Sequence, residues 1–320
     1  MKFFHHPGFA APIGRHMVPV GKPALVAAAV RKLLPHIEIV EPTPVGIADL
    51  LRVHRPEYVE AVRTGDPRSL AESQRFPWST ELFASVCLTN GGVLAAARQA
   101  LEDGASAVLA NGFHHASSDQ GEGYCTFNGL LVALEALRAE KKITTAAVLD
   151  LDLHYGNGTA MLASTRPWLH ALSIYGNDYW ENRSYRDVRA RYHVDGPNHL
   201  SVPLVPTLSG DRDNMLEILE DQLPWLVSKG RPELILYQAG VDLLREDPFS
   251  PLDLGPEDLL ERDRIVFEFA KREGIPIAWT LAGGCAPDIG KVIEAHLNTA
   301  MACSDTFSHA VSKMRRELVL

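Results

Sequence analysis

The sequence predicts an α/β protein with three layers, in which a mostly parallel central sheet lies between two layers of helices. From about residue 107, short apolar runs alternate with segments that have a helical pattern of apolar positions. This alternation is typical of a parallel sheet covered on both faces. Hydrophobic residues make up 46% of the 320 residues and charged residues 22%, which is ordinary for a globular protein. No internal repeat, low-complexity tract or linker divides the sequence, so we predict one domain over residues 1–320.

The first third of the chain is predicted to be mainly helical. Residues 1–20 are rich in Pro, Gly and His and are expected to be irregular. Pro23 is placed to open a helix, because its fixed backbone angle suits the first helical turn. The predicted elements are a helix at 24–34, a strand at 36–40, helices at 47–53 and 57–62, a polar loop at 67–78 and an Ala-rich helix at 89–101.

The rest of the chain carries the regular alternation. Short apolar runs rich in β-branched residues predict buried strands, and Pro224 predicts a kink or stop near the end of its helix. The predicted strands are 107–110, 144–151, 169–174, 234–238 and 275–281. The predicted helices are 127–138, 158–163, 211–227, 256–272, 287–301 and 305–315, with long loops at 111–126 and 175–199.

Charge and cysteine usage argue against several classes of protein. The net charge is −9 and no block of Lys or Arg occurs, so we expect no nucleic-acid partner. The first residues lack the apolar core of a signal peptide, and no apolar run approaches the length of a membrane span. The four cysteines are far apart and are expected to be free thiols in a reducing compartment. A cytoplasmic protein without a membrane partner is the resulting prediction.

Polar residues gather directly after the predicted strand 144–151. Asp152 and His154 are two positions apart, so their side chains fall on the same face of an extended chain. The carboxyl edge of a parallel sheet is where ligands bind, and the two side chains could form half of a metal site. Taken alone, the pattern is more often a strand end with an Asp that caps the next helix.

Three further strand ends strengthen the metal interpretation. His114 and His115 follow the strand 107–110, Asp242 follows 234–238, and two glycines follow 275–281. Each alone has a structural explanation: solvated histidines, a helix cap and a tight turn. Together, Asp152, His154 and Asp242 would form a three-ligand site with one open position, as in catalytic zinc sites. The donors suit Zn²⁺, although Fe²⁺, Mn²⁺ or Co²⁺ could also occupy the site.

The two adjacent histidines predict proton transfer beside that metal. A metal-bound water needs a base within hydrogen-bond reach. His114 and His115 have the right chemistry, and a carboxylate or amide would fix the tautomer of each ring. Asp150 and Asn157 are the nearest candidates for that orienting role.

The motifs resemble those of the histone deacetylase superfamily, which has the arginase/deacetylase fold. The motif sequences are most similar to those of class IV enzymes and bacterial histone deacetylase-like amidohydrolases. The matching segments are GFHHASSDQGEGYCTFN at 112–128, DLDLHYGNG at 150–158, YQAGVD at 237–242 and LAGG at 281–284, with weaker similarity from 51 to 58.

The resemblance implies roles for these residues. Asp152, His154 and Asp242 would hold one Zn²⁺. His115 would be the general base with His114 as its partner, Asp150 pairing with His114 and Asn157 with His115. A structural K⁺ would be held by Asp150, Ser173 and the backbone around Asp152, His154 and Ile174. The substrate tunnel would be lined by Gly123, Tyr124, Tyr179, Gly283 and Gly284.

One position departs from the family pattern. Where the family has a Tyr whose hydroxyl hydrogen-bonds the scissile carbonyl and its oxyanion, this sequence has Cys285. A thiol is shorter and a weak donor, and loss of one oxyanion donor typically lowers kcat by about 10²–10³. A natural variant with altered substrate choice, a weakened or non-catalytic relative and an introduced substitution all remain open. The smaller side chain also leaves room for a bulkier acyl group or a bridging water.

The resulting functional prediction is a zinc-dependent amidohydrolase that removes an acyl group from an amine, by means of metal-activated water and the His pair. The substrate would be acyl-lysine in a peptide, an acylpolyamine or another small amide, and a homo-oligomer stays open. The alternative is an acyl-amine-binding protein that keeps the zinc site but turns over poorly. A third reading, arginase-like manganese hydrolysis, fits less well because two metals need more clustered carboxylates.

Overall fold

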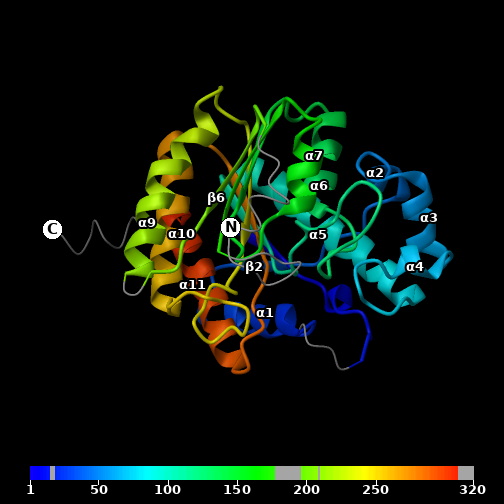
Figure 1. Cartoon of the computed structure of the whole chain (residues 1–320), viewed down its shortest axis with the longest axis horizontal. Helices are drawn as coiled ribbons and strands as arrows, with labels where there is room; N and C mark the ends of the chain where they lie inside the picture. The colour runs from blue at the N-terminus through cyan, green and yellow to red at the C-terminus, as the bar shows by residue number, and fades with distance from the viewer. Residues whose placement is uncertain (15–18, 177–195, 208–209, 309–320) are drawn as a thin grey trace.

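A computed structural model describes residues 1–14, 19–176, 196–207 and 210–308 (Figure 1). Its eight described strands form one sheet in the order β2-β1-β3-β8-β7-β4-β5-β6, and every neighbouring pair is parallel. The predicted α/β fold class is confirmed. The strands are β1 (Lys2–Phe4), β2 (Glu38–Val40), β3 (Ala105–Val108), β4 (Ala146–Asp150), β5 (Leu169–Tyr175), β6 (His199–Pro203), β7 (Ile235–Ala239) and β8 (Ile277–Leu281).

Helices cover both faces of the sheet, with α9, α10 and α11 on one side and α5, α6 and α7 on the other (Figure 1). The α-helices are α1 (Lys22–Leu33), α2 (Ile47–Leu50), α3 (Pro56–Thr64), α4 (Arg68–Ala71), α5 (Thr80–Asp103), α6 (Gly129–Ala139), α7 (Asn157–Ala163), α9 (Asp211–Gln222), α10 (Pro256–Glu273) and α11 (Ile289–Phe307). Two 3₁₀ helices are η1 (Pro7–Phe9) and η2 (Leu223–Val227).

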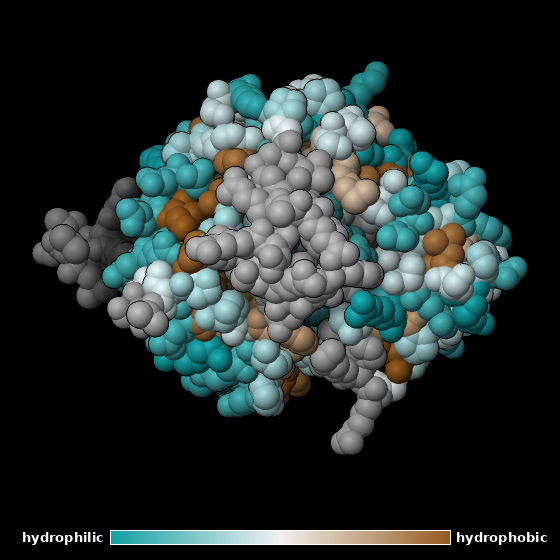
Figure 2. All heavy atoms as spheres, in the orientation of Figure 1, coloured by the Kyte–Doolittle hydropathy of each residue, from teal (hydrophilic) through white to brown (hydrophobic). Residues whose placement is uncertain are grey.

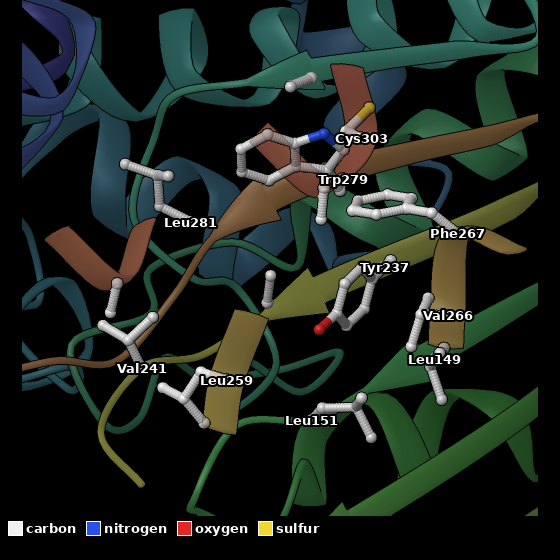
Figure 3. Close-up of a cluster of buried hydrophobic side chains, with 14 of the residues drawn as sticks. Leu149, Leu151, Tyr237, Val241, Leu259, Val266, Phe267, Trp279, Leu281 and Cys303 are labelled. Atoms are coloured by element: carbon white, nitrogen blue, oxygen red, sulfur yellow. The ribbon is translucent and has the colours of Figure 1, made fainter. Parts of the chain in front are cut away.

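The central strands are buried and mostly apolar on both sides because each face packs in a different core. In β4, Ala147 and Leu149 join the core on the α10 side, whereas Ala146 and Val148 join the core on the α5 side. Successive side chains of a strand point to opposite faces, so a strand buried on both sides has no polar alternation. Figure 3 shows the α10-side core, where Trp279 of β8, Tyr237 of β7 and Phe267 of α10 lie together. The Phe267 ring centroid lies 6.0 Å from that of Tyr237 and 6.4 Å from that of Trp279.

A buried polar network anchors α10 to the strand ends that carry the site. Arg262 donates from Nη1 to the carbonyl oxygens of Gly240 at 2.7 Å and Leu151 at 3.2 Å. Its guanidinium also pairs with Asp263 at 2.8 Å, and Asp263 accepts hydrogen bonds from Tyr237 and Thr299 at 2.5 Å. A buried ion pair that is also hydrogen-bonded is costly to break. The network therefore fixes the backbone just before Asp152 and Asp242.

Several predicted elements differ from the structure. The lead-in at 1–20 contains β1, which pairs with both β2 and β3. Residues 199–203, placed at the end of the predicted loop and beyond it, form β6 on the edge of the sheet. The polar loop at 67–78 contains the short helix α4. The helix predicted at 287–301 continues without a break to Phe307, because no helix-breaking residue separates 301 from 305. Residues 309–315 of the helix predicted at 305–315 lie outside the described residues.

Helix α5 begins nine residues before its predicted start, after Ser79, whose side chain accepts a hydrogen bond from the Leu82 N–H at 3.0 Å. By length and composition alone it could cross a membrane, which corrects the statement that no apolar run approaches that length. It is more than half buried, as a core helix would be. Figure 2 shows mostly hydrophilic residues on the visible face, with hydrophobic ones in small separate patches.

Candidate active site

The chemistry lies at the carboxyl ends of β4, β7 and β8, which are neighbours in the sheet. Asp152 and His154 follow β4, and Asp242 follows β7. Their ligand atoms all lie within 4.8 Å of one another. His154 Nδ1 lies 2.8 Å from Asp242 Oδ2 and 3.2 Å from Asp152 Oδ1. Parallel strands bring their carboxyl ends to one edge, so residues 90 positions apart in the sequence meet here.

Backbone N–H groups hold the two carboxylates in place. Leu153 donates to Asp242 Oδ1 at 2.9 Å, and Gly283 donates to Asp152 Oδ2 at 2.8 Å. A side chain at position 283 cannot be accommodated, since its Cβ would lie 2.0 Å from Asp242 Oδ2. The glycine after β8 is thus required by the close approach of its backbone to the candidate ligands.

The charges of the three groups suit a cation. Burial, and then the nearby Asp152, raise the pKa of Asp242 to about 7. Burial lowers the pKa of His154, but its hydrogen bonds to Asp152 and Asp242 outweigh burial and raise it to about 10. Two buried carboxylates repel each other unless a positive charge lies between them. The proton on His154 supplies that charge here, and a divalent ion held by two oxygen ligands and one nitrogen ligand would take its place; the donor set fits zinc.

The two histidines stand beside this cluster on the loop after β3. Their rings lie 4.0 Å apart, and the His115 ring centroid is 6.0 Å from that of His154. His114 Nδ1 lies 2.7 Å from Asp150 Oδ2, and His115 Nδ1 lies 2.7 Å from Asn157 Oδ1. The structure therefore places the two pairs as the sequence predicted them.

The pKa values of the two rings are shifted in opposite directions. Burial lowers the pKa of His114, but Asp150 and Asp152 outweigh burial and raise it. Burial, together with His114 and His154, holds the pKa of His115 well below its ordinary value. His115 is therefore neutral and can accept a proton, whereas Asp150 favours the protonated form of His114.

A cavity of about 420 Å³ leads to these groups. Phe76, Phe113, Tyr124 and Phe249 give it apolar walls, and Val86 of α5 lines a further part. A largely apolar cavity with a few convergent polar groups is typical of a small-molecule site.

Gly123 and Tyr124 take left-handed backbone angles, with φ of 52° and 64°. Both line the cavity, as do Gly283 and Gly284. A Cβ on Gly123 would lie 2.1 Å from His115 Cδ2. This turn therefore needs its glycine next to the His115 ring. Tyr179 lies outside the described residues.

Cys285 also lines the cavity and is partly exposed. Burial raises the pKa of its thiol to about 12, so the sulfur is protonated at neutral pH. Its backbone N–H donates to Asp247 Oδ2 at 2.7 Å, which fixes the turn after β8. A thiol at this place is a poor hydrogen-bond donor.

The residues of the expected K⁺ site lie side by side in β4 and β5. Asp150 is paired with Ser173 in the sheet register, and Ile174 follows in the buried strand β5. Ser173 Oγ is buried, and no hydrogen-bond partner for it occurs in the described part of the chain. A buried hydroxyl normally has a partner, so an oxygen-binding cation would fit beside it.

Three polar residues of the site were not identified from the sequence. Lys22 at the start of α1 is fully buried, lines the cavity, and donates to the carbonyl oxygens of Ala282 and, at 3.3 Å, Gly283. Asp247 holds the Cys285 turn, and Glu122 accepts a hydrogen bond from Asn157 at 2.6 Å. Only Glu122 lies in a segment that the sequence had singled out.

Comparisons with known proteins agree with this geometry. Residues 18–300 match the histone deacetylase domain. Histone deacetylase 2 of Arabidopsis thaliana is 28% identical over 263 residues, which cover 80% of this chain and 65% of that protein. The histone deacetylase-like amidohydrolase of Pseudomonas aeruginosa is 28% identical over 238 residues, covering 72% of this chain and 61% of that protein. The chain thus spans less than two thirds of either relative.

The fold has a close counterpart among solved structures. The crystal structure of the HDA15 HD domain superposes with a TM-score of 0.79, at 17% identity, covering 97% of this chain and 91% of that one. At this identity the likeness shows the shared fold. The family match, in contrast, extends over most of the sequence, including the ends of β3, β4, β7 and β8 that carry the candidate site. The chain therefore belongs to the histone deacetylase domain family.

Proposed function

We propose that this protein is a zinc-dependent amidohydrolase that removes an acyl group from an amine. The observation that carries the proposal is the convergence of Asp152, His154 and Asp242 within 4.8 Å, beside the His114–His115 pair. A bound zinc ion would polarise the amide carbonyl and lower the pKa of water. The protein's own residues hold the metal ion, exclude bulk water from it and transfer protons.

The proton chemistry follows from the two histidines. His115 shares its Nδ1 proton with Asn157 Oδ1, so Nε2 is available to take a proton from the attacking water. His114 is held by Asp150, whose carboxylate raises the pKa of the ring and so favours its protonated form near the developing oxyanion. The proton taken up by the pair is then available to the leaving amine. The products are a carboxylate and a free amine.

The substrate class is proposed from the cavity and the overall charge. The apolar walls of the cavity suit the acyl chain and the methylene stem of an amine. The net charge of −9 suits a cationic partner. Acyl-lysine peptides and acylpolyamines satisfy both conditions. A structural K⁺ beside Asp150 and Ser173, and a cytoplasmic location, belong to the same proposal.

Cys285 favours one competing function, an acyl-amine-binding protein that keeps the metal. The test is release of the free amine from a panel of acetyl- and longer acyl-lysine and acyl-polyamine amides by the zinc-loaded protein. We expect turnover that falls by about 10²-fold or more in His115→Ala, with zinc content unchanged. Binding of the amides without turnover of any of them would support the acyl-amine-binding function and refute the proposal that the protein is an amidohydrolase.

A further inference from the structure

A third group extends the His115–Asn157 pair. Asn157 accepts the His115 Nδ1 hydrogen bond with Oδ1 at 2.7 Å and donates from Nδ2 to Glu122 Oε2 at 2.6 Å. Glu122, Asn157 and His115 therefore form one chain of hydrogen bonds that ends at the proposed general base. Glu122 has no part in the mechanism described above.

The carboxylate decides which way the amide of Asn157 points. The two ends of an asparagine amide are nearly equal in shape, but one end only accepts and the other only donates. An ionised carboxylate can only accept, so Nδ2 must face Glu122 and Oδ1 must face His115. His115 then has to donate from Nδ1. In the neutral ring, the other nitrogen, Nε2, is left without a proton.

The reversed amide would disable the base. If Nδ2 faced His115, Nδ1 would have to act as the acceptor, and the neutral ring would carry its proton on Nε2. A ring in that tautomer cannot take a proton from water at Nε2. Asn157 alone does not exclude this state, whereas a carboxylate on the other side of the amide does.

The backbone holds Glu122 in place for this task. Its N–H donates to Cys125 O at 3.1 Å, and the Cys125 N–H donates to Glu122 O at 2.7 Å. The turn between them contains Gly123 and is packed directly against the His115 ring. The same short turn therefore fixes both the carboxylate and one side of the imidazole.

We propose that Glu122 is a positioning residue that sets the tautomer of His115 through Asn157. This inference rests on the proposed function, because it assigns Glu122 a role in the same reaction. Groups of this kind around a metal site typically change activity by about 10–100-fold when they are replaced.

The first test is Glu122→Gln, which keeps the size of the side chain but can donate as well as accept. We expect kcat to fall about tenfold or more and KM to change little, because the acyl-amine contacts are unchanged. The second variant, Asn157→Asp, is the matched control. A carboxylate at 157 accepts from His115 Nδ1 in either orientation and no longer needs Glu122, which becomes a repelling neighbour.

The combination of the two substitutions separates positioning from a structural role. In the Asn157→Asp background, Glu122→Gln should raise kcat instead of lowering it, because it removes the repulsion between two carboxylates. A loss of the same size in both backgrounds would show that Glu122 acts independently of Asn157 and would overturn the proposal. Thermal unfolding of the unmodified protein, the two single variants and the double variant shows whether a change in kcat reflects a change in stability.

The tautomer of His115 can be measured without any turnover, so the role of Glu122 can be tested separately from the proposed function. In ¹⁵N-histidine NMR of the zinc-loaded protein, His115, assigned with His115→Ala, should be protonated on Nδ1 and not on Nε2. Glu122→Gln should shift a measurable fraction to the Nε2–H form. An unchanged tautomer in Glu122→Gln would refute the role of Glu122 even in an active enzyme. A shifted tautomer in a protein without turnover would sustain it while refuting the proposed function.

Discussion

At the scale of single residues, the site depends on a backbone that approaches the candidate ligands closely. A Cβ on Gly283 would lie 2.0 Å from Asp242 Oδ2, so Gly283→Ala must displace either the carboxylate or the turn after β8. We expect zinc affinity to fall by at least about tenfold, measured by competition with a chelator. Gly21→Ala is the matched control, because no atom of the described residues lies within 4 Å of its Cβ position. Equal affinities in the two variants would contradict this geometry.

Cys285 gives the second prediction at this scale. Its protonated thiol is a weak donor, and a tyrosine hydroxyl there would stabilise the oxyanion. Cys285→Tyr is expected to raise kcat on acetyl amides by about 10²-fold, measured on acetyl-lysine and acetylpolyamine amides.

The opposite result has a separate meaning. If the unmodified protein is active on a bulky acyl group and Cys285→Tyr loses that activity, the small side chain determines specificity. If the unmodified protein and Cys285→Tyr have equal activity on every acyl group tested, residue 285 does not contact the acyl group.

At the scale of elements, His54 links three segments of the chain. Its Nδ1–H donates to Ser117 O at 2.8 Å, and its Nε2 accepts from the Asn128 N–H at 3.0 Å, just before α6. Protonation of Nε2 would break the second bond. Burial accordingly lowers the pKa of His54 to about 4 from its ordinary 6.5.

The pH dependence of stability follows from that shift. Between pH 6.5 and about 4 the unfolded chain binds a proton at His54 that the folded chain does not. The free energy of unfolding should therefore fall as the pH falls through this range, by up to about 3 kcal/mol. Urea unfolding at pH 7 and pH 5 measures the effect. His54→Gln should lose stability at pH 7 and show a smaller pH dependence; an equal pH dependence in both proteins would contradict the assignment to His54.

The same scale shows where sequence patterns succeed and fail. The five strands β3, β4, β5, β7 and β8 are buried on both faces, so their apolar runs are visible in the sequence. Strand β1 has three residues and is defined by its neighbours β2 and β3. No local pattern of that length separates a strand from a loop. Helix boundaries were missed where, as at Ser79, a side-chain cap decides the start.

At the scale of the whole molecule, the parallel sheet made the candidate ligands predictable. Each predicted ligand or histidine follows a strand, and parallel strands bring their carboxyl ends together. The supporting groups were not predictable in this way. Lys22 contacts Ala282 across 260 positions, and its place at the start of α1 carries no signal for that contact. Asp247 likewise acts on a turn 38 positions away.

We propose that one metal ion at Asp152, His154 and Asp242 makes this protein an amidohydrolase. The direct measurement is a zinc titration of the metal-stripped protein, in which bound zinc and amide hydrolysis are followed together. We expect hydrolysis to rise in proportion to zinc and to stop rising at one ion per chain, with Asp242→Asn showing neither tight binding nor activity. Saturation at two ions per chain, or full hydrolysis by the metal-stripped protein, would contradict a single-metal amidohydrolase.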